Sequence, residues 1–249
     1  MPRPLAPGGR LAECMSGRGD ANQREELRRL MKLAHRPILP RTLRETKYKV
    51  AMGGYSVGPN RHAGDDRYCA KCLAARRMRP RGDMPDIFET TEHLFHECPR
   101  EIWEKVLKWW GDRTGETLAR NKELTLLGDR TATAKDRAGR GRLTSFAHLE
   151  EPFALLHSAT LQAIWKERGR FRVSKAPRSP EAVVTDVKRR LQSLANARYA
   201  WVQWWEEWHG HEKRKEAGQH SMEMFESRWI DSGIAEIADG QKVPVRIRW

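Results

Sequence analysis

The residues of this chain best suited to chemistry are three cysteines and one histidine: Cys69, Cys72, His93 and Cys98. They form a C-x2-C pair that is followed, further along the chain, by H-x4-C. A structural zinc site takes four sulfur and nitrogen ligands in tetrahedral geometry, and two cysteines separated by two residues can face one ion across a tight turn. The spacing therefore predicts a structural Zn²⁺ bound by these four side chains, which would stabilise a segment too small to hold its own fold.

The same residues admit other interpretations. Cysteines in a reducing cell often serve as small buried apolar residues, and His93 would then be a solvated histidine on a helix. A disulfide is disfavoured, because we see no secretory signal and the chain is long enough to build a core without cross-links. His96 is a rival third ligand, but it precedes Cys98 by only two residues and would form a cramped chelate. Cys14 is far from the cluster in sequence, and we expect a free thiol there.

The residues around the ligands extend the pattern. The second ligand pair lies in ETTEHLFHECP, Glu89–Pro99, and a tryptophan follows shortly after it. This arrangement resembles the zinc-binding region that follows the polymerase in reverse transcriptases of non-LTR retrotransposons. That region has a C-x2-C, a loop, and then E-T-x-x-H-L-F-x-x-C-P with a tryptophan a few residues on. The matching residues here are Cys69, Cys72, Glu89, Thr90, His93, Leu94, Phe95, Cys98, Pro99 and Trp103.

Flanking segments extend the resemblance to about residues 41–171 of the chain. The family has a helix that ends in a small hinge ahead of the first cysteine, and RETKYKVAMGGYSVG, residues 44–58, is similar. It also has an IWKER-like helical run downstream, which residues 164–168 match. The loop between the ligand pairs, residues 73–88, departs from the family because it is longer and more basic.

The resemblance implies nucleic-acid handling near the template or target, by a carboxy-terminal piece detached from the catalytic parts and partnered by a polymerase encoded upstream. The composition points the same way, since 47 Lys and Arg against 33 Asp and Glu give a formal net charge of +14. Such an excess of positive charge favours binding to RNA or DNA through counterion release, with little sequence preference. The expected phosphate contacts are basic residues within and after the first ligand pair: Lys71, Arg76, Arg77, Arg79 and Arg81.

No catalytic set is recognisable, so we predict a protein that is not an enzyme. A polymerase needs paired aspartates between apolar strands, and Asp65 with Asp66 lies among charged residues that read as a loop. Two other hypotheses stay open: a structural or protein-interaction module in which zinc only stabilises the fold, and a relic reading frame without selected activity. We expect no membrane association, because no apolar run approaches the roughly 18 residues of a membrane span. A nuclear or cytoplasmic location, without secretion, is expected.

Hydrophobic periodicity predicts a mainly α protein, in which a small CCHC zinc-binding unit is embedded among helices and one short strand lies near the C-terminus. Composition divides the chain into four regions. They are a disordered basic arm (1–21), helices with the zinc-binding region (22–111), a flexible linker with a short apolar piece at 124–127 (112–148), and a helical C-terminal region (149–249).

Helices are predicted over residues 22–35, 42–52 and 151–168, with Gly169 and the basic run after it as the end of the last. Another helix is predicted to begin at Pro99 and to stop at Gly111. Its inward face would consist of Ile102, Trp103, Val106, Leu107 and Trp110.

The segment Ser179–Glu181 predicts the start of a long helix that reaches Gly210, because it combines a capping serine, a proline at the first position and an early acid. Thr90 or Thr91 is expected to cap the short helix that carries His93. The C-terminal residues 242–249 alternate in hydrophobicity and predict one edge strand. Four tryptophans continue the period of the long helix and either stack bases or, as we interpret them, form a core face: Trp201, Trp204, Trp205 and Trp208.

Overall fold

The structure, a computed structural model, describes residues 39–51, 68–77, 88–130, 134–135, 148–213, 222–238 and 245–249. Helix accounts for 74% of what is described, which confirms the prediction of a mainly α protein. The basic arm and the helix expected at 22–35 lie outside the described residues. The chain divides into two compact units built from segments that are distant in sequence, and each is described by itself below. The fourfold division made from composition stays a prediction.

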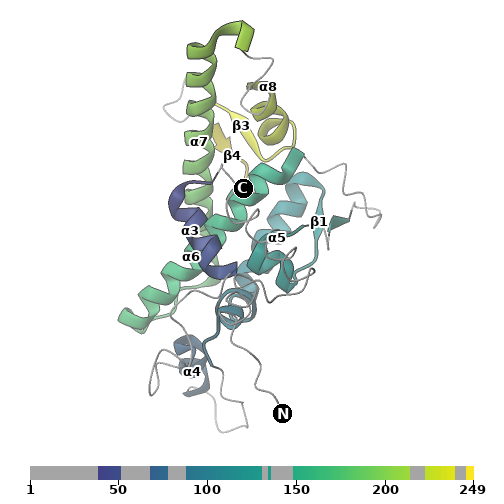
Figure 1. Ribbon diagram of the computed structural model, residues 1–249. Coiled ribbons are helices and arrows are strands. Elements are labelled where there is room, and N and C mark those ends of the chain that lie inside the picture. Colours follow the sequence, from purple (N-terminus) through teal and green to yellow (C-terminus); the bar gives the residue numbers. More distant parts are fainter. Residues whose placement is uncertain are drawn as a thin grey trace, which may run out of the picture. The chain divides into compact units, whose positions relative to one another are not determined.

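Unit 1 comprises residues 1–100, 121–129 and 161–179. Its described elements are helices α3 (Arg41–Ala51) and α4 (Ala70–Arg77), the π-helical turns η2 (His93–Glu97) and η3 (Glu123–Leu127), and the C-terminal part of α6 (Glu150–Ser174), which Figure 1 allows the reader to follow. Helix α3 confirms the helix predicted at 42–52, and η3 contains the apolar piece predicted at 124–127. The turn η3 packs against both α3 and η2. The core of this unit is formed by Leu39, Leu43, Val50, Leu94, Phe95, Leu124, Leu161, Ile164 and Phe171.

Unit 2 comprises residues 101–120, 130–160 and 180–249. Its first helix, α5 (Arg100–Thr114), begins directly after Pro99 as predicted. A proline suits the start of a helix, because its missing N–H would have had no helical acceptor there. The predicted inward face is confirmed, since the buried side chains of α5 are Ile102, Trp103, Val106, Leu107 and Trp110.

The prediction that Gly111 ends α5 is wrong. The helix continues to Thr114, and the residue that ends it is Gly115, which has a φ of 75°. A left-handed residue just after the last turn is the usual way to end a helix, and glycine adopts it without steric cost. Gly111 has a different use, because a Cβ atom there would lie 3.3 Å from the carbonyl oxygen of Glu116, where the chain turns back.

The chain that returns from α5 is held by a buried carboxylate. Glu116 is fully buried, and it accepts hydrogen bonds from Nε1 of Trp110 at 2.7 Å and from Nη1 of Arg130 at 3.1 Å. Burial raises the pKa of Glu116, against the opposing effect of the Arg130 charge. The next residues form strand β1 (Thr117–Leu118), which pairs antiparallel with β2 (Ala134–Lys135). Both strands lie within residues 112–148, the segment predicted from composition as a flexible linker.

The two long helices follow the sequence pattern with one correction. Helix α6 begins at Glu150, close to the predicted start, but it does not end at Gly169 and runs to Ser174. Helix α7 (Pro180–Lys213) begins at the predicted proline. Its inward face is formed by the buried residues Val183, Val184, Val187, Leu191, Leu194, Tyr199 and Val202.

The tryptophans of α7 do not form the core face that we expected. Trp204 is 45% exposed, whereas Trp201 and Trp205 are half-buried with ring centroids 5.5 Å apart. The side chain of Trp208 lies outside the described residues. The buried face of α7 is therefore formed by its aliphatic residues and Tyr199, and Trp201, Trp204 and Trp205 are not among its buried side chains.

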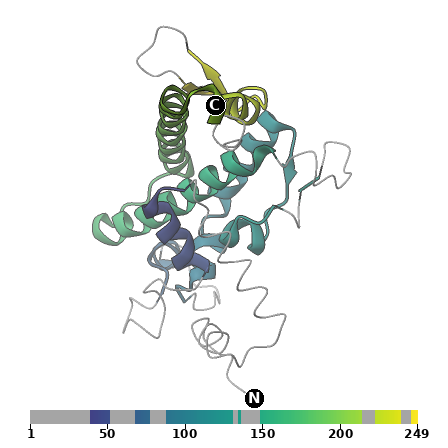
Figure 2. The same ribbon diagram turned by 45° about the horizontal axis from the view of Figure 1, so that its top comes forward.

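The C-terminal part of unit 2 contains α8 (Met222–Phe225), the π-helical turn η5 (Glu226–Ile230), and strands β3 (Ala235–Ile237) and β4 (Val245–Ile247). The predicted C-terminal strand is β4, and its antiparallel partner β3 was not foreseen. Strand β4 packs against α7 and β3 pairs with β4, as the labels of Figure 1 allow the reader to follow; Figure 2 shows the same part of the chain from another side. The Gln192 side chain of α7 donates a hydrogen bond to the carbonyl of Val245 and accepts one from the N–H of Ile247, so the helix covers one edge of the strand.

None of the described helices is both long enough and apolar enough to cross a bilayer.

Candidate metal centre

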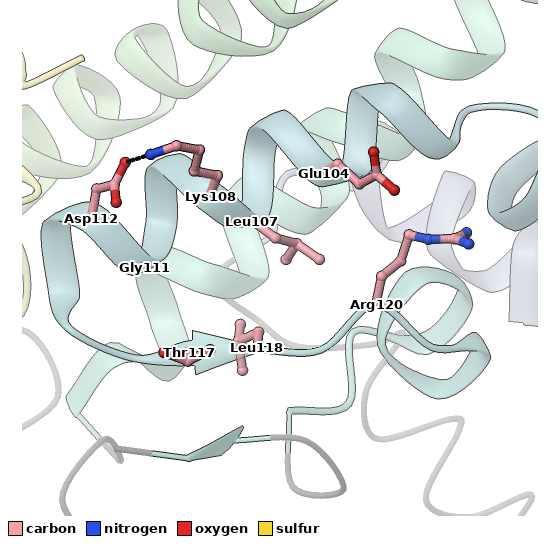
Figure 3. A pocket seen from close by; sticks show the side chains of 8 residues that line it. All are labelled: Glu104, Leu107, Lys108, Gly111, Asp112, Thr117, Leu118 and Arg120. Atoms are coloured by element: carbon pink, nitrogen blue, oxygen red, sulfur yellow. Dashed lines mark hydrogen bonds and ion pairs between the residues drawn. The ribbon is translucent and has the colours of Figure 1, made fainter. Parts of the chain in front are cut away.

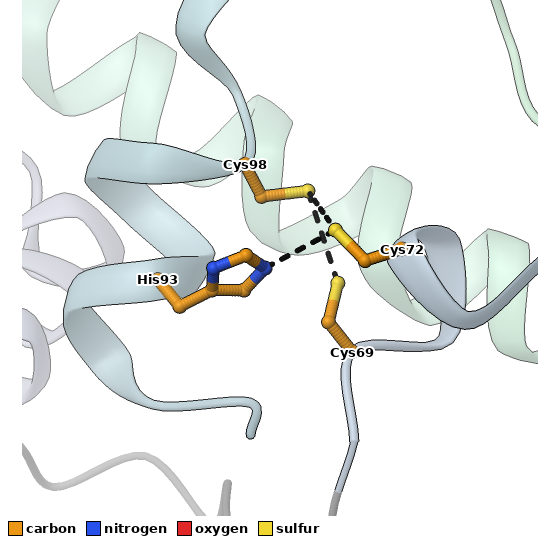
Figure 4. A group of neighbouring side chains, drawn as sticks. All are labelled: Cys69, Cys72, His93 and Cys98. Atoms are coloured by element: carbon orange, nitrogen blue, oxygen red, sulfur yellow. Dashed lines mark hydrogen bonds between the residues drawn. The ribbon is translucent and has the colours of Figure 1, made fainter. Parts of the chain in front are cut away.

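The four side chains predicted as metal ligands converge in unit 1, as Figure 4 shows. Their ligand atoms all lie within 4.8 Å of one another. The Sγ atom of Cys98 is 3.8 Å from the Sγ atoms of both Cys69 and Cys72, and Sγ of Cys72 is 3.3 Å from Nε2 of His93. With metal–sulfur bonds of about 2.3 Å, the edge of a regular tetrahedron of sulfur ligands is about 3.8 Å. The cluster thus has the spacing of a tetrahedral site and could hold a metal ion.

Helix α4 places the first pair of cysteines. Cys69 precedes the helix and its carbonyl accepts the N–H of Leu73 at 2.8 Å, so Cys72 lies in the first turn. The unpaired N–H groups and the dipole at a helix N-terminus favour negative charge, which suits thiolates. An antiparallel bridge between Tyr68 and Phe88, whose rings stack at 5.2 Å, holds the chain entering α4 beside the segment that leads to the second pair.

A π-helical turn places the second pair. Thr90 caps the turn, as one of the two predicted alternatives, by accepting the N–H of His93 on its hydroxyl at 2.9 Å. The N–H of Cys98 donates to the carbonyl of His93 at 2.8 Å, which is a bond between residues five apart. In an α-helix, residues five apart point about 140° away from each other, because each residue turns the chain by about 100°. The wider turn of η2 brings the two side chains toward one side, and this local geometry converts an H-x4-C spacing into a chelating pair.

A carboxylate fixes the orientation of the histidine ring. His93 is buried, and its Nδ1 lies 2.8 Å from Oε2 of Glu97, so Nε2 is the atom that faces the sulfurs. Histidines that bind metals usually donate their other ring N–H to a carboxylate or carbonyl, which fixes the tautomer and raises the basicity of the ligand. The sequence analysis missed Glu97. The available signal was an acid four residues after a helical histidine, the spacing at which helical side chains meet.

We predict that Glu97→Ala lowers the affinity for the metal by about 10- to 100-fold without removing a ligand. The affinity is measured by competition with a chromophoric chelator. Glu92→Ala is the matched control, because Glu92 lies on the same segment but pairs with Lys122 at 2.6 Å and not with the ring. The control is expected to bind the metal like the wild type. Equal affinities for the two variants would contradict the positioning role of Glu97.

The side chains of the cluster differ in how strongly each holds its proton. Hydrogen bonds from Cys72 and Cys98 lower the pKa of Cys69, whereas bonds to Cys69 and Cys72, together with burial, raise the pKa of Cys98. Burial opposes a charge on His93, but the neighbouring thiols and Glu97 raise its pKa to about 11. A positive charge is therefore favourable among these sulfurs. A divalent cation supplies more of that charge than a ring proton and displaces protons as it binds.

The segment that carries the second ligand pair is anchored to α6 within unit 1. Glu89, which is 1% exposed, accepts hydrogen bonds from Nε of Arg168 at 2.8 Å and from Nη2 of Arg172 at 3.1 Å. Phe95 is fully buried and stacks on Trp165 with centroids 6.4 Å apart. The segments 89–99 and 164–168, which are two of those matched in the sequence resemblance, thus pack against each other.

The rival ligand His96 lies outside the cluster. Its Nδ1 is 2.8 Å from Oγ1 of Thr125 in η3, so the ring links the two π-helical turns. Cys14 and the pair Asp65–Asp66 lie outside the described residues.

The residues predicted to contact phosphate are described only in part. Lys71 is exposed on α4, and its contact with phosphate stays a prediction. The first five residues of the expected loop, 73–77, are helical and end α4, which corrects the sequence interpretation. Arg76 and Arg77 belong to this helix, but their side chains lie outside the described residues, as do Arg79 and Arg81 altogether.

Unit 2 contains an open groove of about 470 Å³ beside α5 and β1 (Figure 3). Leu107 and Leu118 form its apolar part, and Lys108 pairs with Asp112 at 2.6 Å at its rim. The remaining lining residues are Glu104, Gly111, Thr117 and Arg120. Acidic and basic groups balance, so the groove favours no charge of ligand, and no cluster of metal ligands or nucleophiles lines it.

No family model, curated protein or solved structure matches this chain.

Proposed function

We propose that this protein is a non-catalytic, zinc-binding, carboxy-terminal part of a reverse transcriptase of the non-LTR retrotransposon kind, which assists the binding of RNA or DNA. The observation that carries the proposal is the distribution of charge. Unit 1 has 27 Lys and Arg against 15 Asp and Glu, whereas unit 2 has 20 against 18. Of the formal net charge of +14, the unit with the metal cluster therefore holds +12.

Zinc is the metal that best suits the donor set. Calcium and magnesium prefer oxygen ligands, whereas three thiolates and one imidazole in a tetrahedron are typical of zinc. Four protein ligands close the coordination sphere and leave no open position for water or substrate, which is the arrangement of a structural site. The ion would act by tying α4 to η2.

The resemblance gains support from contacts that link its parts. Two of the segments matched in sequence are 89–99 and 164–168, and a chance match gives no reason for them to touch. Within unit 1, Glu89 of the first segment accepts from Arg168 of the second, and Phe95 stacks on Trp165. A protein of this kind would work in the nucleus or cytoplasm beside a polymerase encoded upstream.

The mechanism is electrostatic. Lysine and arginine side chains on a metal-stabilised unit neutralise phosphates and release counterions, which fixes position on a nucleic acid without reading its bases. Lys71 and the arginines between residues 76 and 81 stay predicted contacts for this role.

We expect the zinc-loaded full-length protein to bind short labelled RNA and duplex DNA with similar, modest affinity. The logarithm of the binding constant should fall linearly with the logarithm of salt concentration, by about 0.7–0.9 per phosphate contact. Fluorescence anisotropy over a salt series measures this slope. A wild-type protein that binds neither probe at low salt would rule out the proposed function.

A second candidate, a protein-interaction module in which zinc only stabilises the fold, is favoured by one observation. Trp204 is a large aromatic side chain that is 45% exposed on α7, and tryptophan is enriched in the centres of protein interfaces. The absence of nucleic-acid binding would favour this candidate.

A further inference from the structure

The C-terminal end of α6 and the turn that follows it concentrate positive charge. This segment, Lys166–Arg178, is called the basic turn here; it lies entirely in unit 1, and α6 can be followed in Figures 1 and 2. It contains one acid, Glu167, and its basic residues are Lys166, Arg168, Arg170, Arg172, Lys175 and Arg178. Two interpretations are compared: the cations are only exposed to solvent, or the fold holds them in fixed positions as a binding surface.

Two carboxylates hold the four arginines of the basic turn in place. Glu89 binds Arg168 and Arg172, as described above. Glu167 accepts from Nε and Nη2 of Arg170 at 2.9 and 2.7 Å, and its Oε1 also accepts the backbone N–H of Arg178 at 3.2 Å. The Arg178 guanidinium is itself near Glu167, with Nε 3.9 Å from Oε2. Each carboxylate thus faces two guanidinium groups and leaves an excess of one positive charge. The arginines are ordered before any ligand arrives, so little side-chain entropy is lost on binding.

The end of α6 carries a lysine where glycine would be more stable. Lys175 has a φ of 57°, and its N–H donates to the carbonyl of Phe171 at 2.8 Å, which ends the helix. The left-handed conformation costs a residue with a Cβ atom about 1 kcal/mol or more. Arg170 locks this turn by donating to the carbonyl of Ala176 at 2.6 Å. The lysine side chain is exposed, so a strained backbone presents a cation to solvent.

A glycine inside α6 provides a second, independent indication of a binding surface. Gly169 lies between Arg168 and Arg170, and a Cβ atom built on it would meet nothing within 4 Å. Glycine in a helix interior costs about 0.5–1 kcal/mol relative to alanine. Packing does not require it here, because the space beside it is open. Backbone without a side chain, with cations on both sides, allows a bulky anion to approach closely.

We propose that the basic turn is a binding surface for the phosphodiester backbone of a nucleic acid. This inference rests on the proposed function and names the surface that carries it, in addition to the contacts predicted near Lys71. The turn offers charge and little to read a base, because Phe171 is buried and Arg168 covers a face of Trp165 at 4.8 Å. Binding through it is therefore independent of sequence.

The test uses variants that remove binding without weakening the fold. Lys166→Ala/Lys175→Gly removes two cations, and the glycine also relieves the left-handed residue. Gly169→Leu keeps the charge but fills the open space, and leucine favours a helix. Both proteins should melt no lower than the wild type. The control is Lys105→Ala/Lys108→Ala, which removes the same charge from exposed lysines of α5 in unit 2.

Binding of the zinc-loaded full-length variants to a short labelled duplex DNA is followed by anisotropy over a salt series. The double variant of the basic turn should lower the log–log slope by about 1.4–1.8, the value for two phosphate contacts, and the control should leave it unchanged. Gly169→Leu should weaken binding about tenfold or more at fixed salt. Wild-type slopes and affinities for both variants of the basic turn would overturn the inference while leaving the proposed function intact. Equally tight binding of poly-glutamate would overturn the assignment to nucleic acid.

Discussion

Cys98→Ser is expected to lower the affinity for zinc by more than about 100-fold, beyond the loss that follows removal of an outer partner such as Glu97. Cys98 is the ligand that joins the two halves of the site, because its sulfur is 3.8 Å from the sulfurs of both Cys69 and Cys72. A serine hydroxyl does not ionise near neutral pH and replaces a thiolate poorly. Because binding of a structural zinc supplies about 10–16 kcal/mol in small domains, its loss should also loosen α4 and η2.

Metal content is measured by elemental analysis of protein made with zinc present, and local stability by amide hydrogen exchange of residues 68–77 and 88–98. The wild type should hold one zinc per chain. Cys14→Ser is the matched control, since it makes the same substitution at the cysteine that the sequence excludes from the site. Full zinc occupancy in Cys98→Ser, or loss of zinc in Cys14→Ser, would show that the ligand set is wrong.

The sequence predicts the ligands of this site better than the geometry that unites them. Spacing alone pointed to Cys69, Cys72, His93 and Cys98, because two closely spaced pairs of possible ligands lie near each other in the chain. The spacing did not predict the π-helical turn. The same side chains suit an α-helix, with hydrogen bonds between residues four apart, and a π-helix, with hydrogen bonds between residues five apart. Helix α4 was also missed. Its eight residues are too few to be stable alone, so it depends on its surroundings.

Glycines mislead sequence reasoning when their tertiary neighbours are unknown. Gly111 and Gly169 both look like helix ends, but α5 and α6 continue through them. The missing side chain of Gly111 leaves room for the backbone of Glu116, and Gly169 faces open space. By contrast, the start of α7 was predicted correctly, because the serine, proline and acid that mark it act locally. Capping residues therefore predict where a helix begins, whereas the role of a glycine depends on the space that the fold leaves beside it.

Glu89→Gln is expected to destabilise unit 1 by about 3 kcal/mol, the lower end of the cost of breaking a buried ion pair. The side chain of Glu89 is 1% exposed, and those of its partners Arg168 and Arg172 are 12% and 21% exposed. Glutamine fills the same volume but removes the charge that balances two guanidinium groups. Because Glu89 precedes the capping residue Thr90, the change should also lower the affinity for zinc. No sequence pattern predicts this contact, since the carboxylate and Arg168 are 79 residues apart.

Urea unfolding followed by hydrogen exchange in residues 88–98 measures the loss, and Glu92→Gln is the control on the same segment. Glu92 pairs with Lys122, but both side chains are exposed, at 39% and 51%, so the control should cost less than about 1 kcal/mol. The double variant Glu89→Gln/Arg168→Met should lose less stability than the sum of the two single variants. Arg168→Met removes one of the charges that Glu89→Gln leaves unbalanced. Additive effects, or equal losses in Glu89→Gln and the control, would mean that Glu89 does not anchor the metal-binding segment to α6.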